Sequence, residues 1–216
     1  MPETDNQKTY NQIAGQKVQR IEAISDGVFA IALTLLVLDI KVPVADAIHS
    51  EADLIKTFCG LTPRLLTYFL SFMTLGIFWT GQTVQYSYIE KSDRHLNWLS
   101  LFFLLFVSIL PFTTAFLSEH IEYKFSVGLY WANIFALGVT LYIHWVYAER
   151  HGYVTLPPAE NEVVSKAVKK RIVVAQTLYA IGAACCFISI YLSITVIILI
   201  QLNYALGLFT KTGRKK

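Results

Sequence analysis

A run of 38 residues without a charged side chain, Ile172 to Phe209, constrains the fold more than any other feature of the sequence. As one α-helix it would be ~57 Å long, roughly twice the hydrocarbon core of a bilayer. We therefore expect two membrane-spanning helices, over 171–189 and 193–209, with a break near Ser189 to Ser193. The composition agrees, because 55% of the chain is hydrophobic and only 15% is charged, which excludes a disordered or ordinary soluble protein.

Four further apolar segments precede this run, and polar linkers separate them. We predict an all-α integral membrane protein with a six-helix transmembrane domain over 18–209. The N-tail, 1–17, is polar and has no apolar core after a basic start, so no cleavable signal peptide is expected. The C-tail, 210–216, is basic. The remaining predicted helices cover 18–41, 62–86, 96–117 and 125–148.

The distribution of positive charge predicts the orientation. Of the 18 lysines and arginines, 14 fall in the N-terminal segment through Arg20, the second and fourth linkers and the C-tail, and four fall elsewhere. Cytoplasmic segments carry the excess of such residues, so six helices with both termini in the cytoplasm give a strong bias. Five helices would move the C-tail across the membrane and nearly abolish that bias. We expect a prokaryotic inner or plasma membrane.

The first predicted helix begins polar and continues apolar. Arg20, Ser25 and Asp26 lie in its first turns, and the twelve residues from Gly27 to Leu38 are apolar apart from Thr34. Those twelve residues span only ~18 Å, so Asp26 should lie at or below the membrane surface. An acid there is costly, and we expect it to be buried in protein and partnered.

Helical spacing sorts the apolar residues of this helix into one face. With Ile31 at zero and 100° per residue, Leu38 lies at about −20° and Leu35 at about +40°. Asp26 projects to about −140°, nearly opposite. Such a stripe fits ordinary helix packing, and it also fits several copies lining a pore while Asp26 anchors the helix from behind. The full stripe is Ile24, Gly27, Ile31, Thr34, Leu35 and Leu38.

The opening of this helix resembles a known family signature. Arg20, three residues later Ile24-Ser25-Asp26-Gly27, and then Phe29-Ala30-Ile31, are similar to the signature of the endolysosomal potassium channels called transmembrane protein 175 and of their bacterial relatives. The family has Phe where this chain has Ile24. The chain carries a single copy of the signature, which resembles the bacterial single-repeat form, a homotetramer in which helix 1 lines the central pore.

The resemblance implies roles for the stripe. Ile31, Leu35 and Leu38 correspond to an apolar constriction, which can close a pore by dewetting. Thr34 corresponds to a hydroxyl layer associated with potassium preference, with permeant K⁺ nearby. No Thr-Val-Gly-Tyr-Gly sequence is present, so passive K⁺ flux with modest selectivity is expected.

The resemblance also implies a polar network that supports helix 1. Trp79 matches a family Trp, whereas Gln82 stands where the family has His and Ser100 where it has Asn. Leu110-Pro111-Phe112 is similar to the family's Leu-Pro-Phe. The network expected from this pattern and from the predicted orientation comprises Arg20, Ser25, Asp26, Trp79, Gln82, His95, Asn97 and Ser100.

No catalytic motif is visible, so we do not expect an enzyme. The five His and three Cys show no metal spacing, and we expect neither a cofactor nor a metal beyond the permeant ion. The modest net charge of +3 does not suggest nucleic acid as a partner. The expected partners are other copies of the chain and the lipid bilayer. Alternatives are a proton-coupled transporter or proton pathway using Asp26, a membrane enzyme, and a structural subunit.

Overall fold

The computed structural model describes residues 17–45, 48–207, and within them it shows a bundle of long helices. In chain order these are α2 (Val18–Leu35), η1 (Leu36–Asp39), α3 (Glu51–Gly60), α4 (Thr62–Tyr86), α5 (Arg94–Glu119), α6 (Lys124–Arg150), α7 (Pro158–Ala184), η3 (Cys185–Phe187) and α8 (Ile190–Leu206). The N-tail, the end of the last predicted helix and the C-tail lie outside the described residues.

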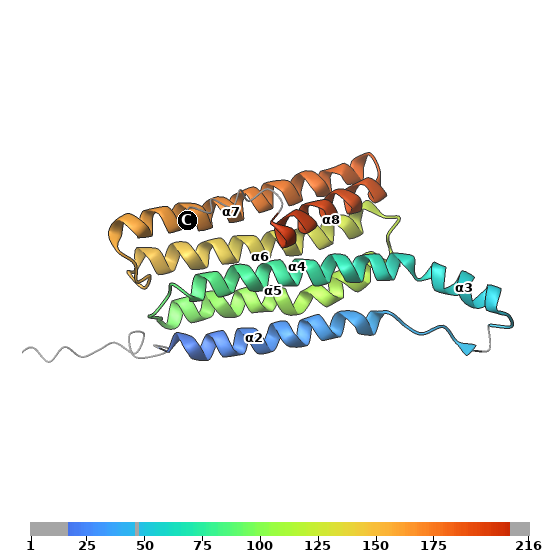
Figure 1. Ribbon diagram of the computed structural model, residues 1–216, viewed down its shortest axis with the longest axis horizontal. Helices are drawn as coiled ribbons and strands as arrows, with labels where there is room; N and C mark the ends of the chain where they lie inside the picture. The colour runs from blue at the N-terminus through green and yellow to red at the C-terminus, as the bar shows by residue number, and fades with distance from the viewer. Residues whose placement is uncertain (1–16, 46–47, 208–216) are drawn as a thin grey trace, which may run out of the picture.

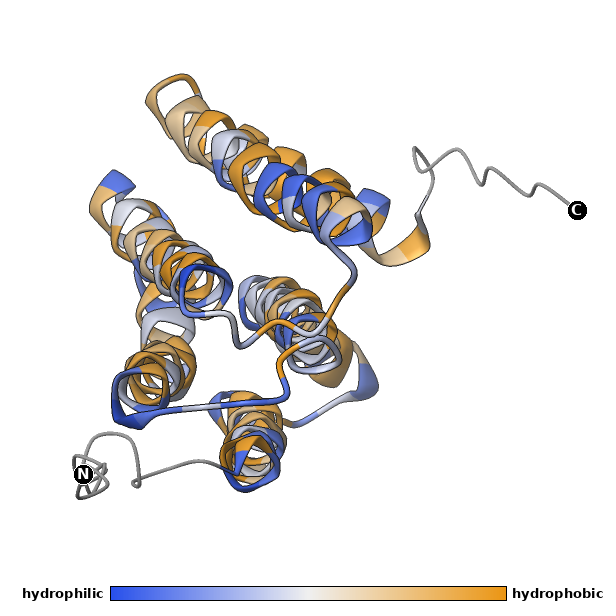
Figure 2. Cartoon of the chain, turned by 90° about the vertical axis from the view of Figure 1, so that its left-hand side faces the viewer, coloured by the Kyte–Doolittle hydropathy of each residue, from blue (hydrophilic) through white to orange (hydrophobic). Residues whose placement is uncertain are grey.

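The helices run side by side along the long axis of the molecule, and α2 forms one edge of the bundle (Figure 1). It packs on α5 and α4, α5 packs on α6, and α6 packs on α7. α8 lies against both α7 and α4. The view along the bundle also places α2 at the margin of the bundle (Figure 2). One broad surface of α2 therefore has no neighbour among residues 17–45 and 48–207.

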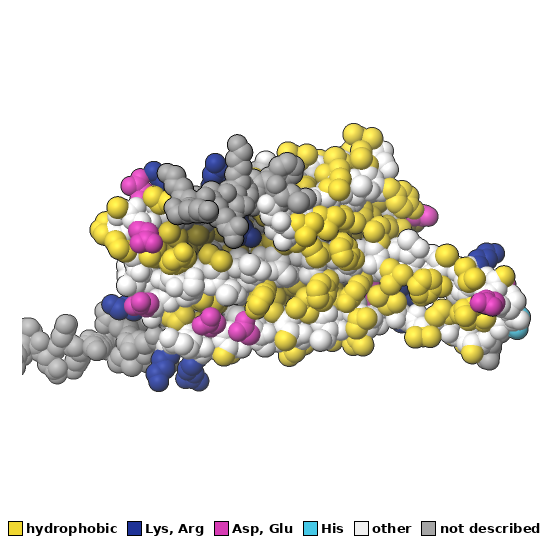
Figure 3. Space-filling view, in the orientation of Figure 1, with side chains coloured by type: hydrophobic (Ala, Val, Ile, Leu, Met, Phe, Trp, Pro, Cys, Tyr) yellow, Lys and Arg dark blue, Asp and Glu magenta, His cyan; other side chains and the backbone are white. Residues whose placement is uncertain are grey.

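Four helical stretches of the described residues are long and apolar enough to cross a membrane: 18–39, 94–119, 124–150 and 158–187. A fifth is the pair α3 and α4, bent by 43° at its break, and α8 is a shorter apolar helix. Charged side chains on the face seen in Figure 3 gather toward the ends of the bundle and on α3, whereas its middle is mostly uncharged. The protein is an all-helical integral membrane protein.

Two helix boundaries differ clearly from those expected, and one helix is additional. The helix expected over 171–189 begins at Pro158, because residues 159–170 are mostly good helix formers and pack beside α6. The break expected at Ser189 to Ser193 lies earlier, at 185–189, where a short 3₁₀ turn precedes α8. α3 was not expected at all. α3 projects beyond the bundle and contains no buried residue (Figure 1). Because none of its residues belongs to the core, burial gave no basis for predicting this helix.

Two linkers meet at the end of the bundle where α2 begins. The backbone N–H of Glu90 donates to the carbonyl of Tyr153 at 3.1 Å, and that of Thr155 donates to Tyr88 at 3.1 Å. The linker between α4 and α5 and the linker between α6 and α7 are thereby joined. These are two of the segments in which the positive charges of the sequence concentrate, so they share one side of the bundle.

The candidate pore-lining helix and its anchors

The apolar stripe predicted on the first helix is exposed on α2. Ile31 is 60% exposed and Leu38 is 70% exposed, and Ile24, Gly27, Thr34 and Leu35 are also exposed. The opposite face of the helix is buried: Val18, Ile21, Ser25, Phe29, Ala32 and Leu36. A row of large aliphatic side chains therefore runs along the unpartnered face of an edge helix. Burial of such a row needs either lipid or another protein surface.

Packing against α4 and α5 fixes which face of α2 points outward. Phe29 is only 1% exposed, and its ring lies 6.0 Å from that of Phe103 on α5. Phe78 of α4 lies 6.2 Å from the same Phe103 ring, so three aromatic rings from three helices form one cluster. Because large rings pack in few orientations, this cluster sets the rotation of α2 about its axis. The stripe is then exposed as a consequence of the core behind it.

Two carboxylates tie α2 and its 3₁₀ extension to the neighbouring helices. The indole N–H of Trp79 on α4 donates to Oδ1 of Asp26 at 2.9 Å. At the other end, the hydroxyl of Ser118 on α5 donates to Oδ2 of Asp39 at 2.8 Å. Hydrogen bonds to a charged acceptor are stronger than neutral ones. The helix is therefore anchored near its middle and at the end of its 3₁₀ extension, and most of the stripe, from Gly27 to Leu38, lies between the two anchors.

Asp26 has the partner that was expected, although it is not buried within a single subunit. Asp26 is exposed, and its partner Trp79 is 44% exposed. The reason is that α2 lies at the edge of the bundle, where its neighbours α4 and α5 leave much of its surface uncovered. The expectation of burial is wrong for the isolated subunit.

Thr34 lies on the exposed face, one turn after Ile31. Its hydroxyl donates to the Ile31 carbonyl at 2.8 Å. This bond satisfies the donor and fixes the rotamer, which leaves lone pairs of the Thr34 oxygen free to accept a hydrogen bond or to contact a cation. The helix continues as α-helix to Leu35 and tightens to a 3₁₀ turn over Leu36–Asp39. Ile31, Leu35 and Leu38 follow one another along roughly 10 Å of the helix.

Comparison with known proteins places this arrangement in a family. The model of the family described as endosomal/lysosomal potassium channel TMEM175 matches residues 20–111. A protein of Streptomyces collinus described as a potassium channel is 31% identical over 189 residues, which cover 86% of this chain and 90% of that protein. A potassium channel of Chamaesiphon minutus is 31% identical and is covered over 93% of its length. The chain belongs to the TMEM175 family.

A solved structure agrees with this assignment. The crystal structure of a lysosomal potassium-selective channel TMEM175 homolog from Chamaesiphon minutus matches with a TM-score of 0.74 at 29% identity, covering 88% of this chain and 96% of that one. The mouse protein described as endosomal/lysosomal proton channel TMEM175 is 32% identical over 150 residues, which are 30% of its length. The chain, which has one copy of the signature, therefore covers nearly the whole length of the bacterial relatives but less than a third of the mouse protein. TMEM175 proteins are ion channels, not enzymes.

Three residues of the expected TMEM175 network come together around a tyrosine that was not foreseen. Nε2 of Gln82 donates to the hydroxyl of Tyr86 at 3.3 Å, and this hydroxyl donates to Oγ of Ser100 at 3.2 Å. Gln82, Tyr86 and Ser100 are all buried. Ser25 of α2 is buried near Tyr86, but its hydroxyl makes no hydrogen bond of normal geometry. Gln82 and Ser100, two of the three departures from the family pattern, therefore meet through Tyr86.

The remaining expected members lie apart from this cluster. The hydroxyl of Ser92 donates to Oδ1 of Asn97 at 2.6 Å, and His95 Nδ1 lies 3.6 Å from Oδ2 of Asp93. These contacts surround the first turn of α5, not the Asp26–Trp79 pair. Arg20 is exposed on the first turn of α2, and among the residues described its guanidinium forms no ion pair with a carboxylate. The expected single network is thus three separate sets.

Asp93 organises the end of the bundle where the linkers meet. Its carboxylate accepts the N–H of Leu96 at 2.8 Å, which caps α5, and it accepts the hydroxyl of Tyr147 at 2.7 Å. Burial raises the pKa of Asp93, but these hydrogen bonds and the nearby His95 outweigh burial and hold the pKa below its usual value. The charged form is thereby favoured, and burial together with this charge raises the pKa of Tyr153.

Sequence reasoning missed Asp39, Ser118 and Tyr86. Tyr86 is four residues after Gln82, which is one helical turn, so a contact between their side chains could have been inferred. Asp39 and Ser118 are 79 positions apart, and only the packing of α2 on α5 brings them together. Asp39 nevertheless gave a signal, because it is an acid at the end of an apolar segment and needed a partner.

Proposed function

We propose that this protein is a passive potassium channel whose pore is lined by α2 from four identical subunits. The observation that carries the proposal is the exposed row Ile31, Thr34, Leu35 and Leu38 on an edge helix, with hydrogen-bonded carboxylates before and after the row. Facing copies of this row would bury it around a common axis. Membership of the TMEM175 family, with bacterial relatives described as potassium channels, supports this use of the surface.

In this proposal the aliphatic residues gate the pore and Thr34 contacts the ion. Rings of Ile31, Leu35 and Leu38 form constrictions that exclude water when narrow, and therefore close the pore without a plug. A ring of Thr34 hydroxyl oxygens replaces part of the hydration shell of K⁺. Hydroxyls provide fewer and weaker dipoles than a carbonyl filter, so the preference for K⁺ over Na⁺ is modest.

The membrane placement completes the proposal. Each subunit contributes six crossings, with α3 and α4 as one bent crossing and α8 as a short one. Both termini lie in the cytoplasm, on the side of the joined linkers and of the basic residues that the positive-inside rule assigns there. We place the channel in a prokaryotic plasma membrane, since relatives that match nearly the whole chain are bacterial.

Recordings from the purified protein in planar bilayers under a potassium–sodium gradient test the proposal. Ile31→Asn is expected to raise conductance, because it wets the constriction, and Thr34→Val is expected to lower the preference for K⁺. Ile143→Asn provides a control, since Ile143 is exposed on α6, away from α2. Unchanged conductance and selectivity in both α2 variants would remove this row from the pore.

A proton pathway through Asp26 is the second candidate. The vertebrate relatives described as endosomal/lysosomal proton channels favour it, together with the exposure of Asp26 beside Trp79. This candidate predicts that Asp26→Asn abolishes proton flux while the assembly remains intact. The anchoring role proposed above predicts instead that Asp26→Asn weakens folding or assembly, with the flux per assembled channel retained.

A further inference from the structure

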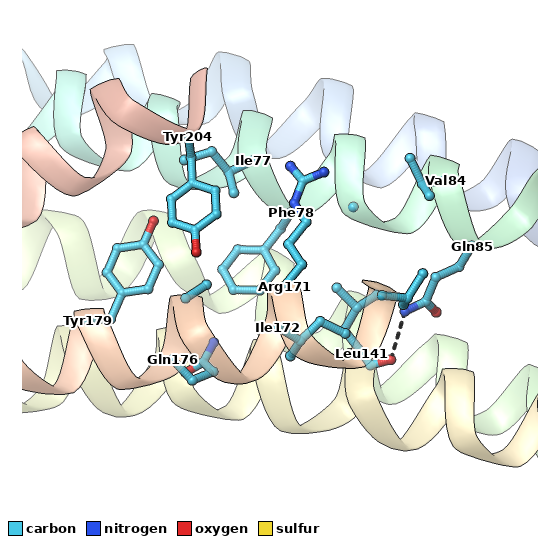
Figure 4. Close-up of a pocket in the computed structure, with 13 residues that line it drawn as sticks. Ile77, Phe78, Val84, Gln85, Leu141, Arg171, Ile172, Gln176, Tyr179 and Tyr204 are labelled. Atoms are coloured by element: carbon cyan, nitrogen blue, oxygen red, sulfur yellow. Dashed lines mark hydrogen bonds between the residues drawn. The ribbon is translucent and has the colours of Figure 1, made fainter. Parts of the chain in front are cut away.

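A pocket lies where α8 ends. α8 stops at Leu206, and Gly207 takes a left-handed conformation with φ of 63°, while α4 and α7 on either side continue along the bundle. The pocket has a volume of about 60 Å³. Its walls come from α4, α6, α7 and α8, and Figure 4 shows the side chains that line it. Most of these are apolar or aromatic, among them Phe78, Leu141, Ile172, Tyr179 and Tyr204.

The polar groups of this pocket are few. Gln85 is buried and donates to the Leu141 carbonyl at 3.0 Å, so its amide is occupied at the floor (Figure 4). Gln176 donates to the Ile134 carbonyl at 3.3 Å. Its Oε1 and the hydroxyl of Tyr179 are buried and have no hydrogen-bond partner among the described residues. The rest of the lining is predominantly apolar, and a slot of this kind is suited to hydrocarbon more than to a charged solute.

Arg171 lies at the edge of this slot and is exposed. Its guanidinium carbon is 6.0 Å from the centre of the Tyr204 ring. Within 17–45 and 48–207, no carboxylate lies within ion-pair distance of Arg171, whereas two lysines of the same helix are paired, Lys166 with Glu162 and Lys169 with Glu149. The sequence that follows, 208–216, has four basic side chains and no acidic one, so it supplies no side-chain counter-ion.

The pocket lies beside the part of α7 that carries its basic side chains, Lys166, Lys169, Lys170 and Arg171. Phe78 and Gly81 of α4 line the pocket, and Trp79 between them holds Asp26 on α2. Arg171 and Asp26 therefore lie at a similar level, where charged side chains replace the apolar ones of the middle of the bundle. A guanidinium at such a level meets phosphate groups, and its planar fork can bind a phosphate through two parallel N–H donors.

We propose that this pocket binds one anionic phospholipid, with its phosphate on Arg171 and part of an acyl chain in the slot between α4 and α7. Basic pockets between membrane helices on the cytoplasmic side are suited to such headgroups. The site does not share residues with the α2 stripe. It rests on the membrane orientation proposed above, but not on ion conduction. The occupant would fill the space that the short α8 leaves open and would join α4 to α7.

Native mass spectrometry of the purified full-length protein in a neutral detergent tests this proposal, with phosphatidylglycerol and phosphatidylcholine of identical acyl chains as ligands. One basic group near the surface is worth ~1 kcal/mol, so the wild type should bind the first retained phosphatidylglycerol about fivefold more tightly than phosphatidylcholine. Arg171→Gln should abolish this preference. Lys170→Gln removes an equal charge from the neighbouring position, which does not line the pocket, and should retain it.

Two further experiments distinguish binding of the acyl chain in the slot from binding of the phosphate at Arg171. Gly81→Leu should weaken binding of both lipids without changing the preference, because a Cβ at Gly81 meets Leu141 Cδ2 at an ordinary 3.5 Å and the longer side chain then occupies the slot. Inorganic phosphate at millimolar concentration should not displace the lipid. Equal loss of the preference in Arg171→Gln and Lys170→Gln, no loss in either, or displacement by phosphate alone would each overturn the proposal.

Discussion

Replacing Trp79 by Phe removes the indole donor and should destabilise the protein, because the hydrogen bond to Asp26 is lost. The bond from Trp79 Nε1 to Asp26 Oδ1 is 2.9 Å long. A sheltered hydrogen bond to a charged acceptor contributes about 1.5–3 kcal/mol. Because Trp79 is 44% exposed and Asp26 is also exposed in a single subunit, competing solvent lowers the expected coupling to about 1 kcal/mol.

A double-mutant cycle isolates this coupling. The free energy of unfolding in detergent micelles is measured for the wild type, Trp79→Phe, Asp26→Ala and the double variant. The double variant should be less destabilised than the sum of the single changes by about 1 kcal/mol. Trp98→Phe is the control, since Trp98 is also exposed but makes no hydrogen bond to Asp26, and its effect should add to that of Asp26→Ala. Additivity within experimental error in the Trp79 cycle would refute the anchoring role of the pair.

Three further predictions concern the anchors and helix contacts. Ser118→Ala should lower the free energy of unfolding by about 1–2 kcal/mol, because it removes the hydroxyl that Asp39 accepts, and chemical unfolding measures this loss. The pKa of Asp93 is lower in the folded state than in the unfolded state. Its ionised form therefore stabilises the fold above the unfolded pKa, and this stabilisation is lost as the pH falls through the folded pKa. In Asp93→Asn, the melting temperature should fall less on acidification than in the wild type. Gly182→Ala places a Cβ 2.9 Å from a side-chain carbon of α8 and should destabilise by roughly 1–3 kcal/mol, whereas Gly128→Ala meets no atom within 4 Å and should not do so by overpacking.

Periodicity in the sequence predicted the important surface of α2. Aliphatic residues at Ile24, Ile31, Leu35 and Leu38, with Gly27 and Thr34 between them, follow the helical period and indicate one face of a helix. The structure places this face outward and Phe29 inward. What periodicity alone does not give is the use of the face, since lipid and a second subunit are both apolar surroundings. The use of this face as a pore lining stays a proposal, which the family resemblance and the high coverage of bacterial relatives support.

Other features were hidden because they depend on contacts between distant segments. The polar stretch before Arg171 looked like a linker, but it is the first part of α7, where Ser165 is buried and accepts the indole N–H of Trp145 at 3.1 Å. The sequence also suggested one network for all signature residues. Helix packing instead divides them, because Gln82 and Ser100 meet at Tyr86 while His95 and Asn97 stay at the start of α5.

The arrangement of α2 in the assembled protein can be measured directly by cryo-electron microscopy of the purified protein in lipid nanodiscs. The account predicts four subunits about one axis, with Ile31, Thr34, Leu35 and Leu38 of each α2 facing that axis and Asp26 held by Trp79 behind them. A map in which Ile31 and Leu35 face lipid, in which another helix occupies the axis, or in which the particle is a single subunit would contradict it.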